Sequence, residues 1–353
     1  MAKSLCDPSV STWTKSFDNS QRTVHILGTA HISSASAELA GRLVREVQPN
    51  VVFVELDVKR VKRAIPGLSS GEKTDTGKTA VSEANINSNQ SNEQTGTSSR
   101  IAAFSSTPTS SDQSDSMQSP IIDIGSKYVG SAVKNMYGKL ESEGFKAGDE
   151  FATSVREGLA IGSTIVLGDR DVEVTLRRLT KALSKTDIRK LLSADSEVEK
   201  SMEELLPENL KAQMMKKQVD QGGGVGGNIG KMVKEQSRRD ETLIGSSKES
   251  SMNVSSIEVD KAEFQMFVET MKEKDNVKKI MGALQKSAPE VYEAMVAERD
   301  VYMGKGLDEL GFNLNSDARD TVAVMGMAHV DGVERYLLSQ GWEAKRYPCP
   351  ALR

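Results

Sequence analysis

Histidine and cysteine are scarce in this chain of 353 residues, which contains three histidines and two cysteines. The cysteines, Cys6 and Cys349, lie near opposite ends of the sequence. Small secreted domains that depend on disulfide bonds carry many more cysteines, so the sequence does not indicate a disulfide framework. This scarcity favours a reducing compartment.

Long apolar runs and an excess of basic charge are also missing. No segment approaches the roughly 18 consecutive apolar residues that indicate a membrane-spanning helix. The first eight residues lack the apolar core of a signal peptide and the arginines of a transit peptide. A net charge of −4 and an isoelectric point near 5.7 give no general attraction to nucleic acid. We therefore expect a soluble, intracellular and cytoplasmic protein that does not bind nucleic acid.

Apolar residues make up 37% of the chain, which is low for a globular protein. A deficit of this kind indicates an ordinary core diluted by segments that do not fold. Residues 66–120 are rich in serine and threonine, and residues 219–256 are rich in glycine and serine. We predict a single domain over residues 1–353 that is interrupted by a disordered insert at 66–120 and a flexible insert at 219–256.

Short apolar runs alternate with amphipathic segments along the rest of the chain. A βαβ unit is predicted from the strand Val24–Leu27, the helix Ser33–Val47 and the strand Val51–Val54, so these strands should be parallel. Two further strands are predicted at Ser163–Leu167 and Val322–Met325. Helical patterns occur at residues 151–160, 172–183, 258–274, 290–310 and 332–339. The fold class is therefore α/β, with a mostly parallel central sheet, flanking helices and a more helical portion.

Unusual polar residues follow the predicted strands at their carboxyl ends. His31 stands three residues after Gly28, His329 stands three residues after Gly326, and Glu55 directly follows the strand that ends at Val54. Ligands of open parallel sheets bind at this edge. We therefore expect the two GxxH histidines and Glu55 to face one cleft.

Two imidazoles and one carboxylate are a ligand set suited to Zn²⁺, Mn²⁺ or Co²⁺ with positions left open for water. Such an ion activates water and polarises a carbonyl group, which supports hydrolysis of an amide or ester. Glu55 is predicted to be either a ligand, with His31 and His329, or the general base. Arg170 and Arg299 are candidates for holding a carboxylate or a developing oxyanion.

The polar residues also have structural explanations, and a histidine that follows a strand, such as His31 or His329, can be a hydrogen-bonded structural residue. The alternatives are a place in the strand core for His25, helix capping by Glu55 or its pairing with Arg60, a turn pair of Asp169 with Arg170, and an ion pair of Glu298 with Arg177 or Arg178.

Five motifs, in this order, resemble the TraB/PrgY/GumN family and cover essentially the whole chain outside the predicted inserts. They are Gly28-Thr29-Ala30-His31-Ile32-Ser33, Val54-Glu55-Leu56-Asp57-Val58-Lys59-Arg60, the stretch from Gly168-Asp169-Arg170 to Arg177-Arg178, Glu298-Arg299-Asp300-Val301-Tyr302-Met303, and Gly326-Met327-Ala328-His329-Val330-Asp331-Gly332.

The resemblance implies a fold similar to the erythromycin-esterase and ChaN-like proteins, together with a metal-dependent peptidase chemistry. The histidines of the family match His31 and His329, its glutamate matches Glu55, and its GDR arginine matches Arg170. Relatives called TIKI are metalloproteases, and PrgY limits a peptide pheromone. A metalloprotease-like hydrolase that acts on a peptide or protein substrate is the function that this resemblance implies.

Two other functions remain open at this point. One is a non-catalytic intracellular regulator or adaptor. Several intracellular members of the family are associated with mitochondria or organelle contacts, so the resemblance implies such a location as one option. No transmembrane segment is expected here, so membrane association would require a partner. The other is binding of haem or a small ligand through one histidine, which the similarity to ChaN-like proteins implies.

Overall fold

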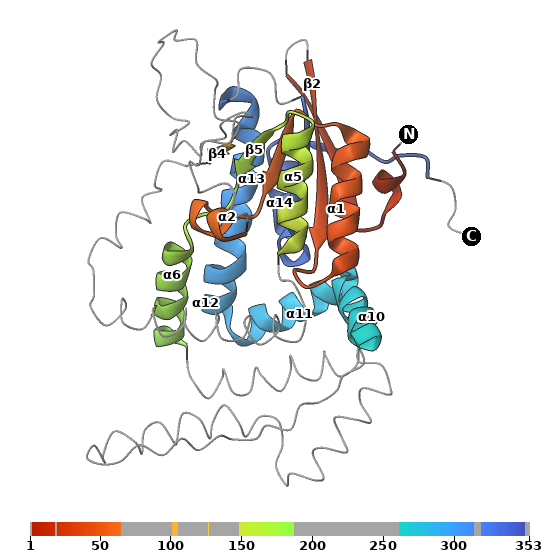
Figure 1. Ribbon diagram of the computed structural model, residues 1–353. Helices are drawn as coiled ribbons and strands as arrows, with labels where there is room; N and C mark the ends of the chain where they lie inside the picture. Colours follow the sequence, from red (N-terminus) through yellow and green to blue (C-terminus); the bar gives the residue numbers. More distant parts are fainter. Residues whose placement is uncertain are drawn as a thin grey trace, which may run out of the picture.

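The computed structural model describes residues 2–17, 20–64, 101–104, 126, 148–186, 261–313 and 319–349. Within these residues, a seven-stranded mixed sheet that is mostly parallel is flanked by helices (Figure 1). The predicted α/β class is therefore confirmed. The predicted insert at 219–256 lies outside the described residues, as does most of the insert at 66–120.

The sheet has the strand order β4-β5-β3-β6-β2-β1-β7. Its strands are β1 (Val10–Phe17), β2 (Ser20–Thr29), β3 (Val51–Val54), β4 (Ile101–Ala103), β5 (Thr164–Leu167), β6 (Asp320–Gly326) and β7 (Glu343–Ala344). The five strands from β4 to β2 are parallel, whereas β1 runs antiparallel to β2 and β7 runs antiparallel to β1. The sequence analysis did not predict β1 or β7.

Continuous apolar runs form the central strands because both faces of the sheet are covered. All four residues of β3 are at most 1% exposed. Successive side chains point to opposite faces, so Val51 and Phe53 join one core cluster while Val52 and Val54 join the other. Each fully buried side chain of this kind contributes roughly 1.5–3 kcal/mol of transfer free energy.

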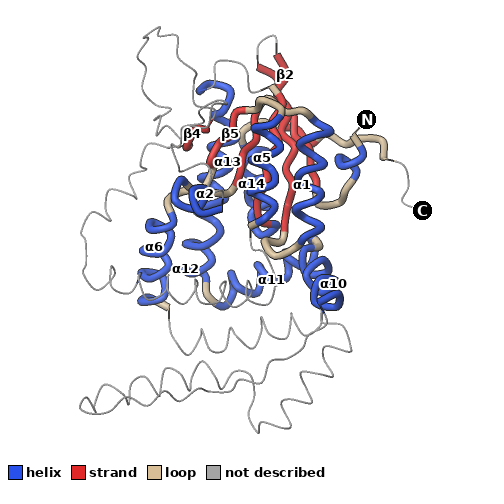
Figure 2. The backbone as a smooth tube through the Cα atoms, viewed as in Figure 1, coloured by secondary structure: helices blue, strands red, loops and turns tan. Residues whose placement is uncertain are grey.

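Two pairs of helices cover the two faces of the sheet (Figures 1 and 2). α1 (Ser34–Val47) and α5 (Asp149–Ala160) lie on one face, and α13 (Glu298–Asn313) and α14 (Met327–Ser339) lie on the other. The remaining helical elements are η1 (Lys3–Cys6), α2 (Val58–Ala64), α6 (Val172–Lys185), α10 (Lys261–Lys272), α11 (Lys274–Ser287), α12 (Pro289–Tyr292) and η4 (Glu293–Ala297).

Three helical predictions are corrected by the structure. The helix predicted over residues 332–339 begins at Met327, so Asp331 lies inside it. The segment predicted as one helix from residue 290 contains a single π-helical turn, η4, between α12 and α13. The helix predicted over 258–274 ends at Lys272, and α11 follows at once.

Two strand predictions also change. Ile101–Ala103 forms β4 within the segment predicted to be disordered, and Phe104 after it is only 4% exposed, so that prediction is wrong for these residues. Gly28 does not end its strand, because β2 continues to Thr29. Instead, a Cβ at Gly28 would lie 2.5 Å from the Met327 side chain, so glycine permits close packing of α14 on the strand.

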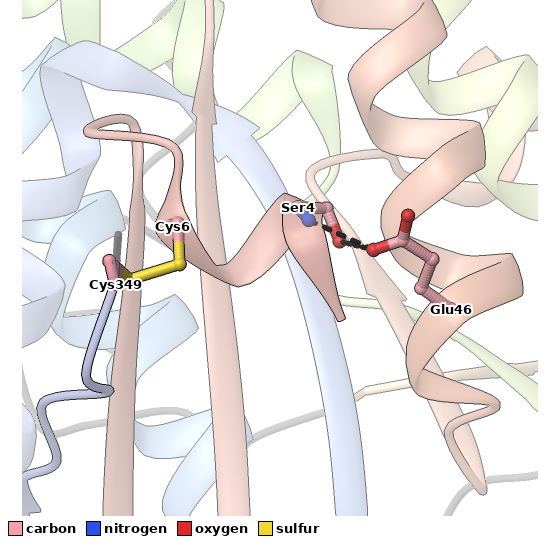
Figure 3. The surroundings of a disulfide bond; sticks show 4 residues. All are labelled: Ser4, Cys6, Glu46 and Cys349. Atoms are coloured by element: carbon pink, nitrogen blue, oxygen red, sulfur yellow. Dashed lines mark hydrogen bonds between the residues drawn. A yellow bond between two sulfur atoms is a disulfide. The ribbon is translucent and has the colours of Figure 1, made fainter. Parts of the chain in front are cut away.

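A disulfide bond joins Cys6 to Cys349, contrary to the expectation from the low cysteine count (Figure 3). Nearby, the Ser4 hydroxyl and backbone N–H both donate to Glu46 on α1, at 2.8 and 2.9 Å, and hold η1 against that helix. The bond removes the cysteine-based support for a reducing compartment, because disulfides persist mainly in oxidising surroundings. Among the described residues, no helix is both long and apolar enough to span a membrane.

Candidate active site

The predicted polar residues follow the parallel strands at one edge of the sheet. Parallel pairing places Thr29 of β2 beside Gly326 of β6, and Val54 of β3 beside Val324 of the same strand. His31 follows β2, Glu55 directly follows β3, and His329 lies in the first turn of α14, the helix that follows β6. The strand register therefore brings the three predicted ligands to one place.

Glu55 is the centre of this site, and its side chain is 3% exposed. The backbone N–H of Gly326 donates to Oε2 at 2.7 Å, and Arg299 Nη2 donates to Oε1. His329 Nε2 lies 3.3 Å from the same Oε1. One buried carboxylate thus joins the end of β3 to both the β6–α14 junction and α13.

His31 approaches Glu55 from the other side. A Cβ at Gly326 would stand 2.9 Å from His31 Nε2 and 3.3 Å from Glu55 Oε2, so both atoms border the same small space beside this glycine. The other ring nitrogen, Nδ1, lies 2.8 Å from Glu150 Oε1 on α5. The His31 side chain is 34% exposed, whereas those of His329 and Glu55 are at most 5% exposed. Solvent therefore reaches the site from the His31 side.

His329 is buried between two helices. Its Nδ1 lies 2.7 Å from Asp300 Oδ1 on α13, and its Nε2 lies 3.0 Å from Arg299 Nη1. In the neutral ring, Nε2 accepts from Arg299, since a guanidinium group is only a donor. The Nδ1 proton is then donated to Asp300.

Arg299 connects the site to a buried network of charges. It donates to Asp169 through Nε at 3.1 Å and through Nη2 at 2.7 Å, and Nη1 donates to the carbonyl of Met295 in the π-helical turn at 3.2 Å. Arg60 also pairs with Asp169. All three guanidinium nitrogens of Arg299 are therefore engaged, and an incoming anion would have to displace one of these partners.

The electrostatic field of the site favours positive charge on the imidazoles. Burial alone would lower the pKa of His329, but Glu55 and Asp300 raise that pKa to about 9. Burial also opposes protonation of His31, yet its hydrogen bond to Glu150 and the charge of Glu55 leave its pKa raised. Burial would raise the pKa of Glu55, but His329 and Arg299 hold this pKa well below its ordinary value.

Arg170 lies in a different arrangement from the one predicted for an anion-binding group. It donates to Glu298 at 2.6 Å, to the Ala294 carbonyl at 2.6 Å and to Thr175 at 3.0 Å. These contacts fix the π-helical turn to the start of α6, and none of them reaches the two GxxH histidines. An anion-binding role for Arg170 stays a prediction, whereas its contacts show that it joins α6 to the π-helical turn.

Most of the structural alternatives can now be decided. Glu298 is an ion-pair partner of Arg178, as predicted, at 2.7 Å. Glu55 does not cap α2 or pair with Arg60, because Asp57 accepts the Lys59 and Arg60 backbone N–H groups at 2.8 and 2.9 Å and pairs with the Arg60 side chain.

His25 has the predicted structural role. It lies inside β2, is 4% exposed, and its Nδ1 is 2.9 Å from the Thr12 hydroxyl of β1. Asp169 accepts the backbone N–H of Arg170 but makes its side-chain ion pairs with Arg299 and Arg60, so the predicted turn pair is replaced by a wider network.

The residues of the site suit a divalent cation. The donor set is two imidazole Nε2 atoms and one carboxylate, and each imidazole has a carboxylate at its other nitrogen, as metal-bound histidines commonly do. The buried carboxylates of the surrounding network outnumber its guanidinium groups, so the surplus carboxylates can be balanced by positive charge on the imidazoles or by a bound cation. The carboxylates are those of Glu55, Asp57, Glu150, Asp169 and Asp300, and the guanidinium groups are those of Arg60 and Arg299.

The described residues hold no group of three His, Cys, Asp or Glu side chains already at metal-ligand spacing. The Arg299 guanidinium group contacts both Glu55 Oε1 and His329 Nε2. A cation between these atoms requires Arg299 to withdraw.

Comparison with known proteins finds a weak similarity to an archaeal protein. No family model matches the chain. The chain is 24% identical over 318 residues to an uncharacterized protein of Methanocaldococcus jannaschii, an alignment that covers 89% of this chain and 53% of that protein. The chain therefore spans about half the length of this relative, whose name states no activity.

Two residues that contact the GxxH histidines, Glu150 and Asp300, were not predicted as site residues. Both are buried and each contacts one of the two GxxH histidines. Asp300 adjoins Arg299 in the fourth motif, which was a usable signal. Glu150 occupies the first turn of α5, where an acidic residue is expected for the helix dipole alone, so its sequence position carried no specific signal.

Proposed function

We propose that this chain is a metal-dependent hydrolase that cleaves peptide bonds in a peptide or protein substrate. The observation that carries the proposal is the convergence of both GxxH histidines on one buried carboxylate. His329 Nε2 lies 3.3 Å from Glu55 Oε1, and His31 Nε2 borders the space beside Gly326 that Glu55 Oε2 also borders. Three separate segments of the chain supply these groups.

His31, His329 and Glu55 would hold the ion, which would be Zn²⁺, Mn²⁺ or Co²⁺. A bound ion of this kind supplies an activated water and polarises the scissile carbonyl. Where Glu55 is the general base instead of a ligand, Oε2 would remain bonded to the Gly326 N–H while Oε1 accepts a proton from water. The exposed edge of His31 is the side from which a substrate would enter.

Arg299 would hold the developing oxyanion once it leaves Glu55 and His329. Its bonds to Asp169 through Nε and Nη2 would keep the guanidinium group beside the reacting carbonyl. We propose peripheral membrane association, through a partner, as the setting for this activity.

The test compares three single-histidine variants, because the chain has three histidines and only two lie at the site. Purified wild-type protein is loaded with Zn²⁺, Mn²⁺ or Co²⁺, its metal content is measured, and cleavage of a mixed peptide library is followed before and after chelation. His31→Ala and His329→Ala should lose both bound metal and cleavage. His25→Asn should keep both, since His25 lies in β2 and binds Thr12.

Failure of the wild-type protein to bind any of the three ions stoichiometrically would contradict the proposal. Metal binding without cleavage of any peptide would leave a binding protein, and pull-down of partners by the His31→Ala variant would then favour the adaptor function. A Soret absorbance band on addition of haem, lost in the same variant, would favour haem binding instead.

A further inference from the structure

Each GxxH histidine has its own buried carboxylate at Nδ1. Glu150 Oε1 lies 2.8 Å from Nδ1 of His31, and Asp300 Oδ1 lies 2.7 Å from Nδ1 of His329. The two carboxylates come from helices on opposite faces of the sheet, α5 and α13 (Figure 1). We propose that Glu150 and Asp300 are positioning residues that turn Nε2 of the two histidines toward Glu55 and a shared cation; this inference rests on the proposed function.

The physical basis is the choice between the two ring nitrogens. A carboxylate accepts a hydrogen bond from Nδ1–H, which fixes the tautomer that leaves the Nε2 lone pair for a ligand. The same hydrogen bond fixes the rotation of the ring about its bond to Cβ. It also raises the basicity of Nε2, because the carboxylate stabilises the positive charge that a bound cation induces on the ring.

Glu150 is held in place with no exposed surface. Oε1 also accepts from the Thr29 hydroxyl at 3.3 Å, and that hydroxyl lies 3.2 Å from the Met325 carbonyl. The Gly148 N–H donates to the carbonyl of His31 at 2.7 Å, so the start of α5 forms hydrogen bonds with both the backbone and the ring of this residue. Glu150 Oε2 is buried and has no hydrogen-bond partner in the described part of the chain. A buried acceptor left unpaired is costly, which is typical of a functional position.

Asp300 depends on a glycine of the facing helix. A Cβ at Gly332 would lie 1.9 Å from Asp300 Oδ2 and 2.4 Å from its Cγ, so any other residue at this position would displace the carboxylate. His329 and Gly332 are one turn apart on α14. The helix therefore both carries the histidine and leaves room for the carboxylate that orients it.

The experiment measures the affinity of the full chain for Co²⁺ alone, from the visible absorbance of the bound ion. Glu150→Gln and Asp300→Asn retain the shape of each side chain and remove its charge. Each should weaken Co²⁺ binding by about 10–100-fold, the usual effect of changing the carboxylate behind a metal-bound histidine.

Matched controls lie on the same two helices. Glu157→Gln is on α5, where Glu157 pairs with Arg45. Asp308→Asn is on α13, where Asp308 accepts from Lys15 and from Trp342 Nε1, at 2.8 and 2.7 Å. Both should bind Co²⁺ as the wild type does.

A steric variant separates position from charge. Gly332→Ala removes no charge but moves Asp300, so it should weaken Co²⁺ binding as Asp300→Asn does. The double variant with both substitutions should bind Co²⁺ little more weakly than Asp300→Asn alone. If Gly332→Ala unfolds the protein, Asp300→Asn alone decides. Wild-type affinity and spectrum in both Glu150→Gln and Asp300→Asn would overturn the inference.

Proton NMR distinguishes failure of the inference from failure of the proposed function. With three histidines, each ring resonance can be assigned by substitution. Hydrogen bonds from Nδ1–H to carboxylates shift that proton strongly downfield, and Glu150→Ala should remove the His31 signal while Asp300→Ala removes that of His329. Both losses in a protein that binds no Co²⁺ would uphold the positioning roles and refute the metal-dependent activity. Unchanged resonances would refute the positioning roles themselves.

Discussion

Arg299 donates through Nη2 to Glu55, and its Nη1 lies 3.0 Å from Nε2 of His329. One guanidinium group thus stands where a cation held by these two residues would stand. Two positive groups cannot share this space. Removal of the Arg299 guanidinium group should therefore favour binding of a divalent ion.

Arg299→Gln should destabilise the protein by about 3–5 kcal/mol, because it leaves the buried Glu55 without its guanidinium partner and leaves Asp169 paired with Arg60 alone. Zn²⁺ or Co²⁺ should then raise the melting temperature of this variant by more than it raises that of the wild type. Thermal unfolding with and without the ion makes the measurement. Arg22→Gln is the control, since Arg22 is also buried but donates to the carbonyls of Leu307 and Asp308 away from the site. Equal stabilisation of the two variants by the ion would contradict the linkage.

Gly326→Ala should disturb the site directly. The added Cβ would lie 2.9 Å from His31 Nε2 and 3.3 Å from Glu55 Oε2, so the His31 ring must shift. We expect a loss of roughly 1–3 kcal/mol in unfolding free energy and a loss of metal binding. Gly282→Ala is the opposite case, because a Cβ there meets nothing within 4 Å on α11 and should stabilise the helix by up to about 1 kcal/mol. Urea titrations of the two variants compare their unfolding free energies. Unaltered metal binding in Gly326→Ala would contradict a metal site formed by His31 and Glu55 beside this glycine.

Acid should weaken the fold through His25. Burial lowers its pKa to about 4 despite the opposing effect of Asp320, and Lys345 lowers it further, while the unfolded chain has a pKa near 6.5. The unfolded state therefore binds more protons between these values, and stability is lost as the pH falls from about 6.5 toward 4. Between pH 7 and pH 5 this group alone should remove about 2 kcal/mol.

The His25→Asn variant isolates this contribution. Asparagine can still accept from the Thr12 hydroxyl but does not titrate, so its unfolding free energy should fall less between pH 7 and pH 5 than that of the wild type. Urea unfolding at the two pH values gives this difference. An equal fall in unfolding free energy in the wild type and the variant would exclude His25 as the cause.

Arg170→Lys distinguishes a positional role from anion binding. Lysine keeps the charge but cannot reach Glu298, the Ala294 carbonyl and Thr175 at once, so we expect a loss of about 1–3 kcal/mol in stability. Arg45→Lys, at the exposed pair with Glu157, should change stability by less than about 0.5 kcal/mol. Loss of peptide cleavage at unchanged stability would instead favour the anion-binding role first predicted for Arg170.

The strand ends could be predicted because they follow from local pattern. Buried apolar runs with polar residues directly after them placed His31, Glu55 and His329 at one edge of the sheet. The partners of these residues could not be predicted in the same way. Glu150 meets His31 only because α5 begins beside the carbonyl of that histidine, a contact between segments more than 100 residues apart.

Other differences have equally local causes. β1 was missed because most of its residues are serine, threonine or lysine and only the neighbours Thr12 and Trp13 are buried, so no continuous apolar run marks it. The start of α14 was misplaced because Met327 has no capping side chain before it; Gly326 occupies the N-cap. The Cys6–Cys349 bond depends on the two chain ends meeting, which spacing alone does not reveal.

That bond has a consequence for the connectivity of the molecule. Cys6 and Cys349 are separated by 343 positions, so the backbone between them and the sulfur bridge together form one covalent ring. A single cut anywhere within this ring linearises it without releasing a fragment. The protein nicked once by a protease will therefore migrate as one species until a reductant is added, and only then separate into two.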